Sequence, residues 1–98
     1  WYGEQFHGQQ TASGETYDMY GFTAAHKTLP FHTIVRVTDP LTRKSVVVRV
    51  TDRGPYVDGR VIDLSWAAAS DLDLKRRGVI PVRLKILRWG DGSRDFTE

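Results

Sequence analysis

Alternating apolar and polar positions in the first half of the chain predict a β-hairpin. Thr33 to Thr38 alternates, with Val35 and Val37 on the face expected to be buried. The next five residues, DPLTR, have the composition of a turn. Ser45 to Thr51, SVVVRVT, resumes the alternation, with its even-numbered valines inward and Arg49 outward.

A second clear alternation, Ile80 to Trp89, predicts a strand with its aliphatic residues inward and its basic residues in solvent. Two short helices are also expected. Thr23 can cap one or two helical turns that end near Thr28, because Pro30 forbids continuation. Ser65 can cap a helix over residues 66–72, and Gly78 closes that segment.

The remaining stretches have weaker patterns. Trp1 to Gly3 is typical of the end of a strand, and a polar loop follows it. Gly90 to Glu98 has no pattern, so we expect a domain over residues 1–89 and a tail or linker stub over 90–98. Strands predominate, and a small, mostly β barrel with helical crossovers accommodates them without exposed edges.

Length and composition narrow the class of protein. The 98 residues suffice for one domain, and 40% hydrophobic with 27% charged residues is typical of a soluble globular fold. The net charge of +2 is too small to indicate a nucleic-acid binder. Cysteine is absent, which excludes disulfides and thiolate metal sites. The first residue is Trp1, so we expect a mature form or fragment whose export signal is missing.

Polar chemistry concentrates between two strand-like runs, in the segment TDRGPYVDGRVID from Thr51 to Asp63. Polar loops held by β-structure are where function usually resides. Asp52, Asp58 or Asp63 could serve as an acid or base, and Arg53 and Arg60 could hold an anionic substrate. The alternative interpretation is a surface turn with solvated charges.

Other kinds of site have less support from the sequence. The three histidines, His7, His26 and His32, show no recognised ligand spacing, so we expect no metal and no cofactor. Gly54 and Gly59 lie in neither of the phosphate-binding glycine patterns and are better explained as turn residues.

Four ordered motifs carry a family resemblance along nearly the whole chain. They are WYG, TASGETYDM, FTAAHKTLPFHT and VRVTDRGPYVDGRVIDLS, the last followed by an alanine-rich helix. Together they resemble the rare lipoprotein A (RlpA-like) family. The resemblance implies a six-stranded double-psi β-barrel with short helices, the fold of barwin, expansins and family-45 endoglucanases. It also implies an endolytic lytic transglycosylase that cleaves the MurNAc–GlcNAc bond of peptidoglycan glycan strands, preferring strands that lack stem peptides.

The resemblance further implies a place and partners for the protein. Its partner is the peptidoglycan glycan strand, and its location is the periplasm or cell envelope, with a possible lipid anchor in the outer membrane. The domain itself is expected to be soluble and monomeric. Two positions depart from the family pattern: Thr51 replaces a usual asparagine, and His32 stands where glycine is common.

The family's catalytic aspartate corresponds to Asp52, its histidine to His26 and its supporting glutamate to Glu15. A lytic transglycosylase needs one carboxyl group, because the muramic acid's own 6-hydroxyl attacks the anomeric carbon. We hypothesise that Asp52 donates a proton and then accepts that of the hydroxyl. Burial or Glu15 could keep Asp52 protonated, an inward Arg53 would oppose this, and His26 could orient Asp52 or carry the proton. Asp63 is the reserve acid, with loop bracing or helix capping as its alternative.

Candidate binding groups each have a structural alternative. Tyr20 and Tyr56 can stack on sugars while half exposed, whereas Phe22 and Phe31 are expected in the core. Arg53 and Arg60 can pair with the lactyl carboxylate of muramic acid, or else with Asp58 or Asp63 internally.

Two other functions compete with the enzyme. One is a non-catalytic, expansin-like module that binds peptidoglycan or another polysaccharide, and the other is a partner-binding domain of an envelope complex. The fold cannot separate them, because function depends on the site.

Overall fold

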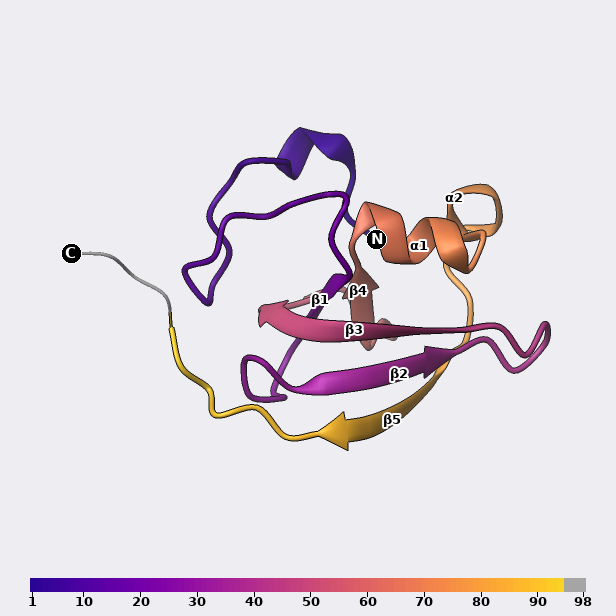
Figure 1. The fold of residues 1–98 in the computed structure, drawn as a ribbon. Coiled ribbons are helices and arrows are strands. Elements are labelled where there is room, and N and C mark those ends of the chain that lie inside the picture. The colour runs from indigo at the N-terminus through magenta and orange to yellow at the C-terminus, as the bar shows by residue number, and fades with distance from the viewer. Residues whose placement is uncertain (95–98) are drawn as a thin grey trace.

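The computed structural model describes residues 1–94 and shows one mixed, five-stranded sheet with short helices on one side (Figure 1). The sheet order is β4-β1-β3-β2-β5. The elements are η1 (Glu4–Phe6), β1 (Thr23–His26), β2 (Ile34–Thr38), β3 (Ser45–Asp52), β4 (Ile62–Leu64), α1 (Trp66–Asp71), α2 (Leu74–Arg77) and β5 (Arg83–Arg88). The mostly β class predicted from the sequence is confirmed.

The predicted hairpin is formed by β2 and β3, which pair antiparallel with Val37 opposite Val46. β2 also pairs antiparallel with β5. On the other side of β3, β1 runs parallel to it and pairs antiparallel with β4. The parallel pair therefore lies inside the sheet, and β4 and β5 form its two edges.

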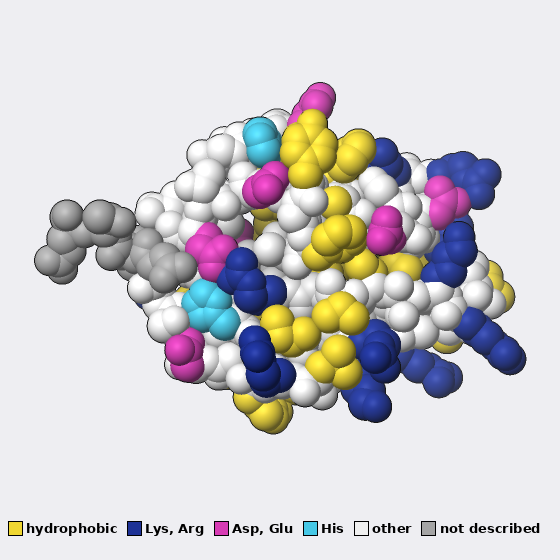
Figure 2. Space-filling view, viewed as in Figure 1, with side chains coloured by type: hydrophobic (Ala, Val, Ile, Leu, Met, Phe, Trp, Pro, Cys, Tyr) yellow, Lys and Arg dark blue, Asp and Glu magenta, His cyan; other side chains and the backbone are white. Residues whose placement is uncertain are grey.

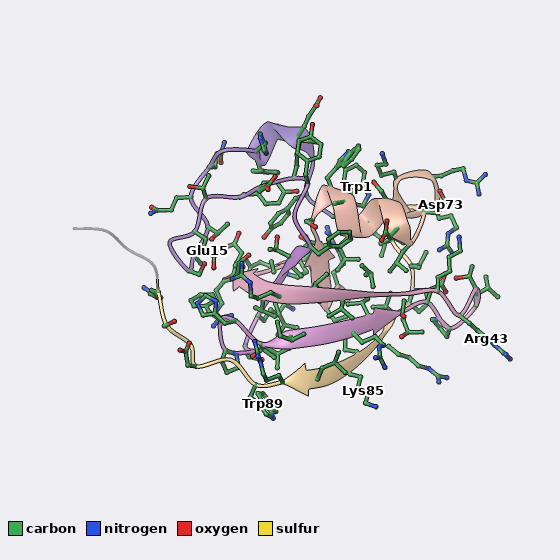
Figure 3. The ribbon with its side chains drawn as sticks, viewed as in Figure 1. Trp1, Glu15, Arg43, Asp73, Lys85 and Trp89 are labelled. Carbon is green, nitrogen blue, oxygen red and sulfur yellow. The ribbon has the colours of Figure 1, made fainter. Side chains whose placement is uncertain are left out.

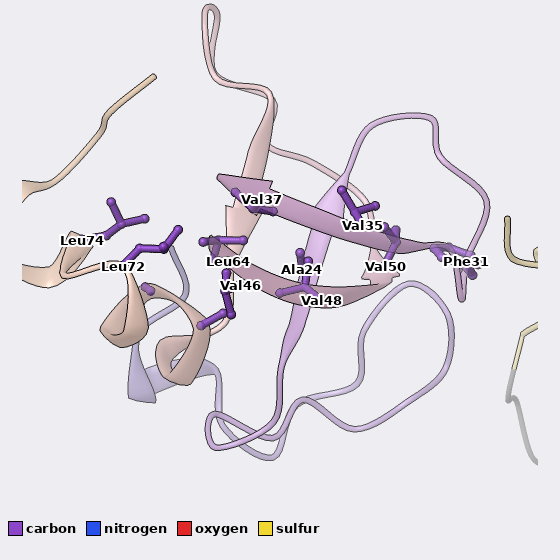
Figure 4. Packing of buried hydrophobic residues seen from close by; sticks show 12 residues of the cluster. Ala24, Phe31, Val35, Val37, Val46, Val48, Val50, Leu64, Leu72 and Leu74 are labelled. Atoms are coloured by element: carbon purple, nitrogen blue, oxygen red, sulfur yellow. The ribbon is translucent and has the colours of Figure 1, made fainter. Parts of the chain in front are cut away.

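The core lies between the sheet and α1. The valines predicted to point inward from β2 and β3 are buried, and they pack with Ala24, Phe31, Leu64 and Leu72 (Figure 4). Ser65 caps α1 as predicted, accepting a hydrogen bond from the backbone of Ala68. The chain turns after α1 into α2, where Arg77 donates to the buried carboxylate of Asp39 at 2.7 Å.

The helical turns predicted from Thr23 to Thr28 are wrong, because Thr23–His26 is the strand β1. Ala24 pairs with Val50 on one side and with Leu64 on the other, and it is fully buried. Sheet pairing on both sides satisfies the backbone of this short segment and overrides the helix propensity of alanine. Thr23 is not a helix cap: its N–H donates to the Ser65 hydroxyl.

Three other features of the structure differ from the predictions. β5 begins at Arg83, later than the predicted Ile80. Trp1 to Gly3 forms no strand, although the N–H of Tyr2 donates to the carbonyl of Leu64. Within residues 1–94 the structure has five strands, and it shows neither a sixth strand nor barrel closure. Part of the predicted tail, residues 95–98, lies outside the described residues.

Candidate functional site

Parallel pairing of β1 and β3 brings two of the predicted catalytic residues to the same end of these two inner strands. β1 ends at His26 and β3 ends at Asp52, and the register pairs Ala25 with Asp52. Strands that run in the same direction end on the same side, so His26 and Asp52 lie near each other there. On the other side of β1, Ala25 pairs with Asp63.

The carboxylate of Asp52 accepts three hydrogen bonds. The Tyr2 hydroxyl donates to Oδ2 at 2.8 Å, and the N–H groups of Ala12 and Arg53 donate to Oδ1 at 2.8 and 2.9 Å. Both oxygens act only as acceptors, which is the pattern of an ionised carboxylate. The three donors come from distant parts of the chain and fix the orientation of the group.

Asp52 also forms part of the wall of a cavity of about 260 Å³. The remaining lining residues come from the first part of the chain: Tyr2, Phe6, Gln9, Gln10, Thr11 and Tyr17. Burial and the negative charge of Asp52 raise the pKa of Tyr2, so its phenol stays protonated and remains a donor to Asp52. The cavity thus has aromatic walls, amide groups and one oriented carboxylate.

His26 is held by the turn that follows β1. Its Nδ1 accepts hydrogen bonds from the N–H groups of Thr28 and Leu29, both at 3.1 Å. The ring proton of the neutral imidazole therefore sits on Nε2. Burial, reinforced by the nearby Arg53 and Lys27, lowers the pKa of His26, so the site favours the neutral ring.

Glu15 lies beside the end of β3 (Figure 3). Both of its oxygens accept from the guanidinium of Arg49, with the Nη2–Oε2 bond at 2.8 Å. The Nδ1 atom of His32 lies 3.6 Å from Oε1. The hydrogen bonds from Arg49 lower the pKa of Glu15. Its carbonyl accepts from the N–H of Thr11, so the ion pair ties the loop over residues 11–15 to β3.

The arginines predicted to bind substrate have partners within the protein. Nη1 of Arg53 donates to the carbonyls of His26 and Leu29, at 3.2 and 2.7 Å, and its guanidinium stacks 3.9 Å from the centre of the Phe31 ring. Arg60 forms an ion pair with Asp63. The Arg60 contact matches the internal alternative that the sequence left open, whereas Arg53 contacts neither Asp58 nor Asp63 among the ion pairs of residues 1–94. Substrate binding by these arginines stays a prediction.

The predicted aromatic binding residues are exposed. Tyr56 is 78% and Tyr20 66% exposed, and Tyr20 packs edge-on against His7 and Trp66. Phe31 is buried, as expected for a core residue, but the same prediction for Phe22 is wrong because 44% of it is exposed. Asp58 is exposed, as the solvated-turn interpretation expects.

Sequence reasoning missed three groups that shape this site: the Tyr2 hydroxyl, the Ala12 N–H and the Arg49 guanidinium. Tyr2 belongs to the WYG motif, but nothing in the sequence pairs it with an aspartate fifty positions away. Arg49 was expected to be a solvated outward residue of its strand. Only the positive charge of Arg49 could have suggested that it pairs with a carboxylate such as that of Glu15.

Neither a metal centre nor a membrane-spanning helix is found in the described part of the chain. Residues 1–94 contain no group of three or more His, Cys, Asp or Glu side chains placed to hold a metal ion. Within the same residues, no helix is both long and apolar enough to cross a bilayer.

Comparison with known proteins identifies relatives over most of the chain. The endolytic peptidoglycan transglycosylase RlpA of Pseudomonas aeruginosa is 59% identical over 87% of this chain, and that of Vibrio cholerae is 54% identical over 89%. The RlpA protein of Campylobacter jejuni is 50% identical over 95%. The matched regions cover 25%, 33% and 34% of these relatives, so the chain spans about a quarter to a third of their length. The family model for lytic transglycolases matches residues 1–84, and the chain therefore belongs to that family.

Proposed function

We propose that this chain is the catalytic domain of an endolytic lytic transglycosylase of the cell envelope. Its substrate is the MurNAc–GlcNAc bond of peptidoglycan glycan strands, preferably strands without stem peptides, and its products carry 1,6-anhydro-MurNAc ends. The relatives named as endolytic peptidoglycan transglycosylases support the activity. The family match and the mixed sheet support a double-psi β-barrel as the complete fold.

Asp52 is the general base and acid of this proposal. Its resting form is the carboxylate, since three donors surround it. It accepts the proton of the muramic acid 6-hydroxyl as that oxygen bonds to the anomeric carbon, and the same carboxyl group delivers the proton to the departing O4 of GlcNAc. One proton moves from O6 to O4, and no water is consumed. The hypothesis from the sequence had Asp52 donate a proton before accepting one. In this proposal Asp52 accepts first, so it need not be protonated when the substrate binds.

His26 and Glu15 have different roles in this scheme. Nδ1 of His26 already accepts two hydrogen bonds from its own turn. The N–H group at Nε2 is therefore the one that donates to the glycan. Glu15 is a positioning residue. Its pairing with Arg49 holds the loop whose Ala12 N–H contacts Asp52.

The observation that carries the proposal is the oriented carboxylate of Asp52 in the wall of a cavity. The test uses glycan strands stripped of stem peptides, with mass spectrometry of the product ends. Asp52→Asn should lower the rate at least ~10²-fold, because acid–base catalysis contributes that much. The matched control is Asp58→Asn, which changes an exposed carboxylate of the same segment and should retain activity.

The product ends separate the competing functions. Anhydro-muramic ends from the unmodified chain support the transglycosylase, and reducing ends would instead identify a hydrolase. Binding to the glycan without any product would replace the proposal by the non-catalytic module. Full activity of a folded Asp52→Asn variant would remove Asp52 from the mechanism.

A further inference from the structure

A cluster of four basic residues lies on the outer side of the sheet and takes no part in lining the cavity beside Asp52. β2 alternates between buried valines and outward residues, and its outward Arg36 pairs with Lys85 of β5. Thr38 pairs with Arg83 and Ile34 with Arg88. Directly paired residues project to the same side of a sheet. We call Arg36, Arg83, Lys85 and Arg88 the outer basic face.

The charges of this face are not neutralised by acidic neighbours. Neither β2 nor β5 contains an aspartate or glutamate. Within residues 1–94, no ion pair involves any of the four basic residues, whereas Arg49, Arg60, Arg76 and Arg77 each pair with a carboxylate. A cluster of unpaired cations repels itself, so an anionic partner would stabilise it.

Apolar side chains are exposed among and beside these cations. Val47, which pairs with Arg36, is 44% exposed, Leu87 is 41% and Trp89 is 64% exposed. Figure 2 shows hydrophobic side chains beside Lys and Arg over this part of the sheet. Figure 3 shows Lys85 and Trp89 projecting from the same side of the β5 segment. Neither of the two cavities found beside Asp52 and beside Asp63 is lined by the outer basic face.

We propose that the outer basic face docks on the surface of a bilayer that contains anionic phospholipids. Basic side chains are attracted to the headgroup phosphates, and tryptophan and leucine side chains enter the adjoining apolar layer. A soluble anionic polymer would be attracted to the cations alone. The exposed apolar side chains of Trp89 and Leu87 beside these cations favour the lipid surface.

The outer basic face and the cavity beside Asp52 share no residue. The cavity is lined by residues of the first part of the chain and by Asp52 at the end of β3, whereas the four cations lie on β2 and on the edge strand β5. Docking of the outer basic face therefore uses no residue of the proposed catalytic site.

Vesicle co-sedimentation of the full chain tests the proposal. The protein should sediment with vesicles of 30% phosphatidylglycerol in phosphatidylcholine at 50 mM NaCl, remain free with pure phosphatidylcholine, and bind more weakly at 500 mM NaCl. The Arg36→Glu/Lys85→Glu variant should bind at least tenfold more weakly, since each cation near an anionic surface contributes about fivefold. Trp89→Ala should lower binding severalfold at unchanged charge.

The matched control is Lys75→Glu/Arg76→Glu, which makes the same change of net charge on α2. It should alter binding less than threefold. Equal weakening of the two double variants would show a net-charge effect and overturn the proposal, as would failure of the unmodified chain to bind the anionic vesicles. Equal affinity for soluble polyphosphate would show that the partner is an anionic polymer and not a lipid surface. If circular dichroism shows that the first variant is unfolded, Arg83→Gln/Arg88→Gln takes its place.

Discussion

His32 has a backbone conformation that favours glycine and a side chain that makes two contacts. Its φ of 73° lies in the left-handed region, which costs a residue with a Cβ about 1–2 kcal/mol. The resemblance to the RlpA-like family implies glycine at this position, and glycine would adopt this φ without that cost. Here Nδ1 lies 3.0 Å from Nη1 of Arg49, and Nε2 lies 3.0 Å from the Ser93 carbonyl. These polar contacts offset part of the backbone cost.

The pKa of His26 should lie below 6.5, the ordinary value of an imidazole, because burial and two neighbouring cations oppose its protonation. NMR of ¹⁵N-labelled protein should show the proton of the neutral ring on Nε2, since Nδ1 accepts two backbone hydrogen bonds. A midpoint above 6.5, or a proton on Nδ1, would contradict the geometry of this turn. His7 offers a comparison, since its Nδ1 accepts one backbone N–H, that of Met19.

Glu15→Gln should lower the free energy of unfolding at pH 7 by about 1–2 kcal/mol, because it weakens a charge-assisted pair with Arg49. The folded-state pKa of Glu15 lies below 4.5, the ordinary value of a glutamate, so this stabilisation is present above pH 4.5 and is lost as the pH falls through the folded-state pKa. Urea unfolding at pH 7 and pH 3 should therefore show a smaller difference between variant and parent in acid. An equal difference at both pH values would contradict the pairing.

At the scale of elements, Ser65 connects α1 to the sheet. Its buried hydroxyl accepts from the N–H groups of Ala68 and Thr23 and donates to the Gly21 carbonyl at 2.7 Å. Ser65→Ala should cost about 1–2 kcal/mol of stability in urea unfolding, since it removes a helix cap and leaves buried groups unpaired. Ser70→Ala, in the same helix, is the control. Within residues 1–94 its hydroxyl bonds to the Trp66 carbonyl one turn earlier and to no other group, so the change should be smaller.

Elements that depend on residues close together in the sequence could be predicted, and elements that depend on distant residues could not. The β2–β3 hairpin and the Ser65 cap could be predicted because local alternation and one capping residue determine them. β1 could not, because Ala24 and Ala25 become strand residues only through partners in β3 and β4. The site divides in the same way. Family motifs predicted Asp52, His26 and Glu15 as site residues, while the partners of Asp52 and Glu15, Tyr2 and Arg49, depend on long-range contacts.

At the scale of the whole molecule, one core joins the sheet to its helices, so unfolding should be a single transition. Leu72→Ala should lower the free energy of unfolding by about 2–5 kcal/mol, since this side chain is fully buried and the core cannot close over the space it leaves. Circular dichroism and tryptophan fluorescence should report the same midpoint. Leu41→Ala should change stability little, because Leu41 lies in a turn and is 85% exposed.

The attachment of the chain at the two edges of the sheet has a mechanical consequence. Near its start, the N–H of Tyr2 bonds to Leu64 of β4, and after β5 the N–H of Gly90 bonds to the Thr33 hydroxyl. A Cβ on Gly90 would lie 2.1 Å from the Phe31 carbonyl, so the chain is pressed closely against this turn. Tension applied between Tyr2 and Gly90 therefore reaches the sheet at β4, at β3 through the Tyr2–Asp52 hydrogen bond, and at the turn before β2. The load would be divided among these attachment points instead of falling on one strand.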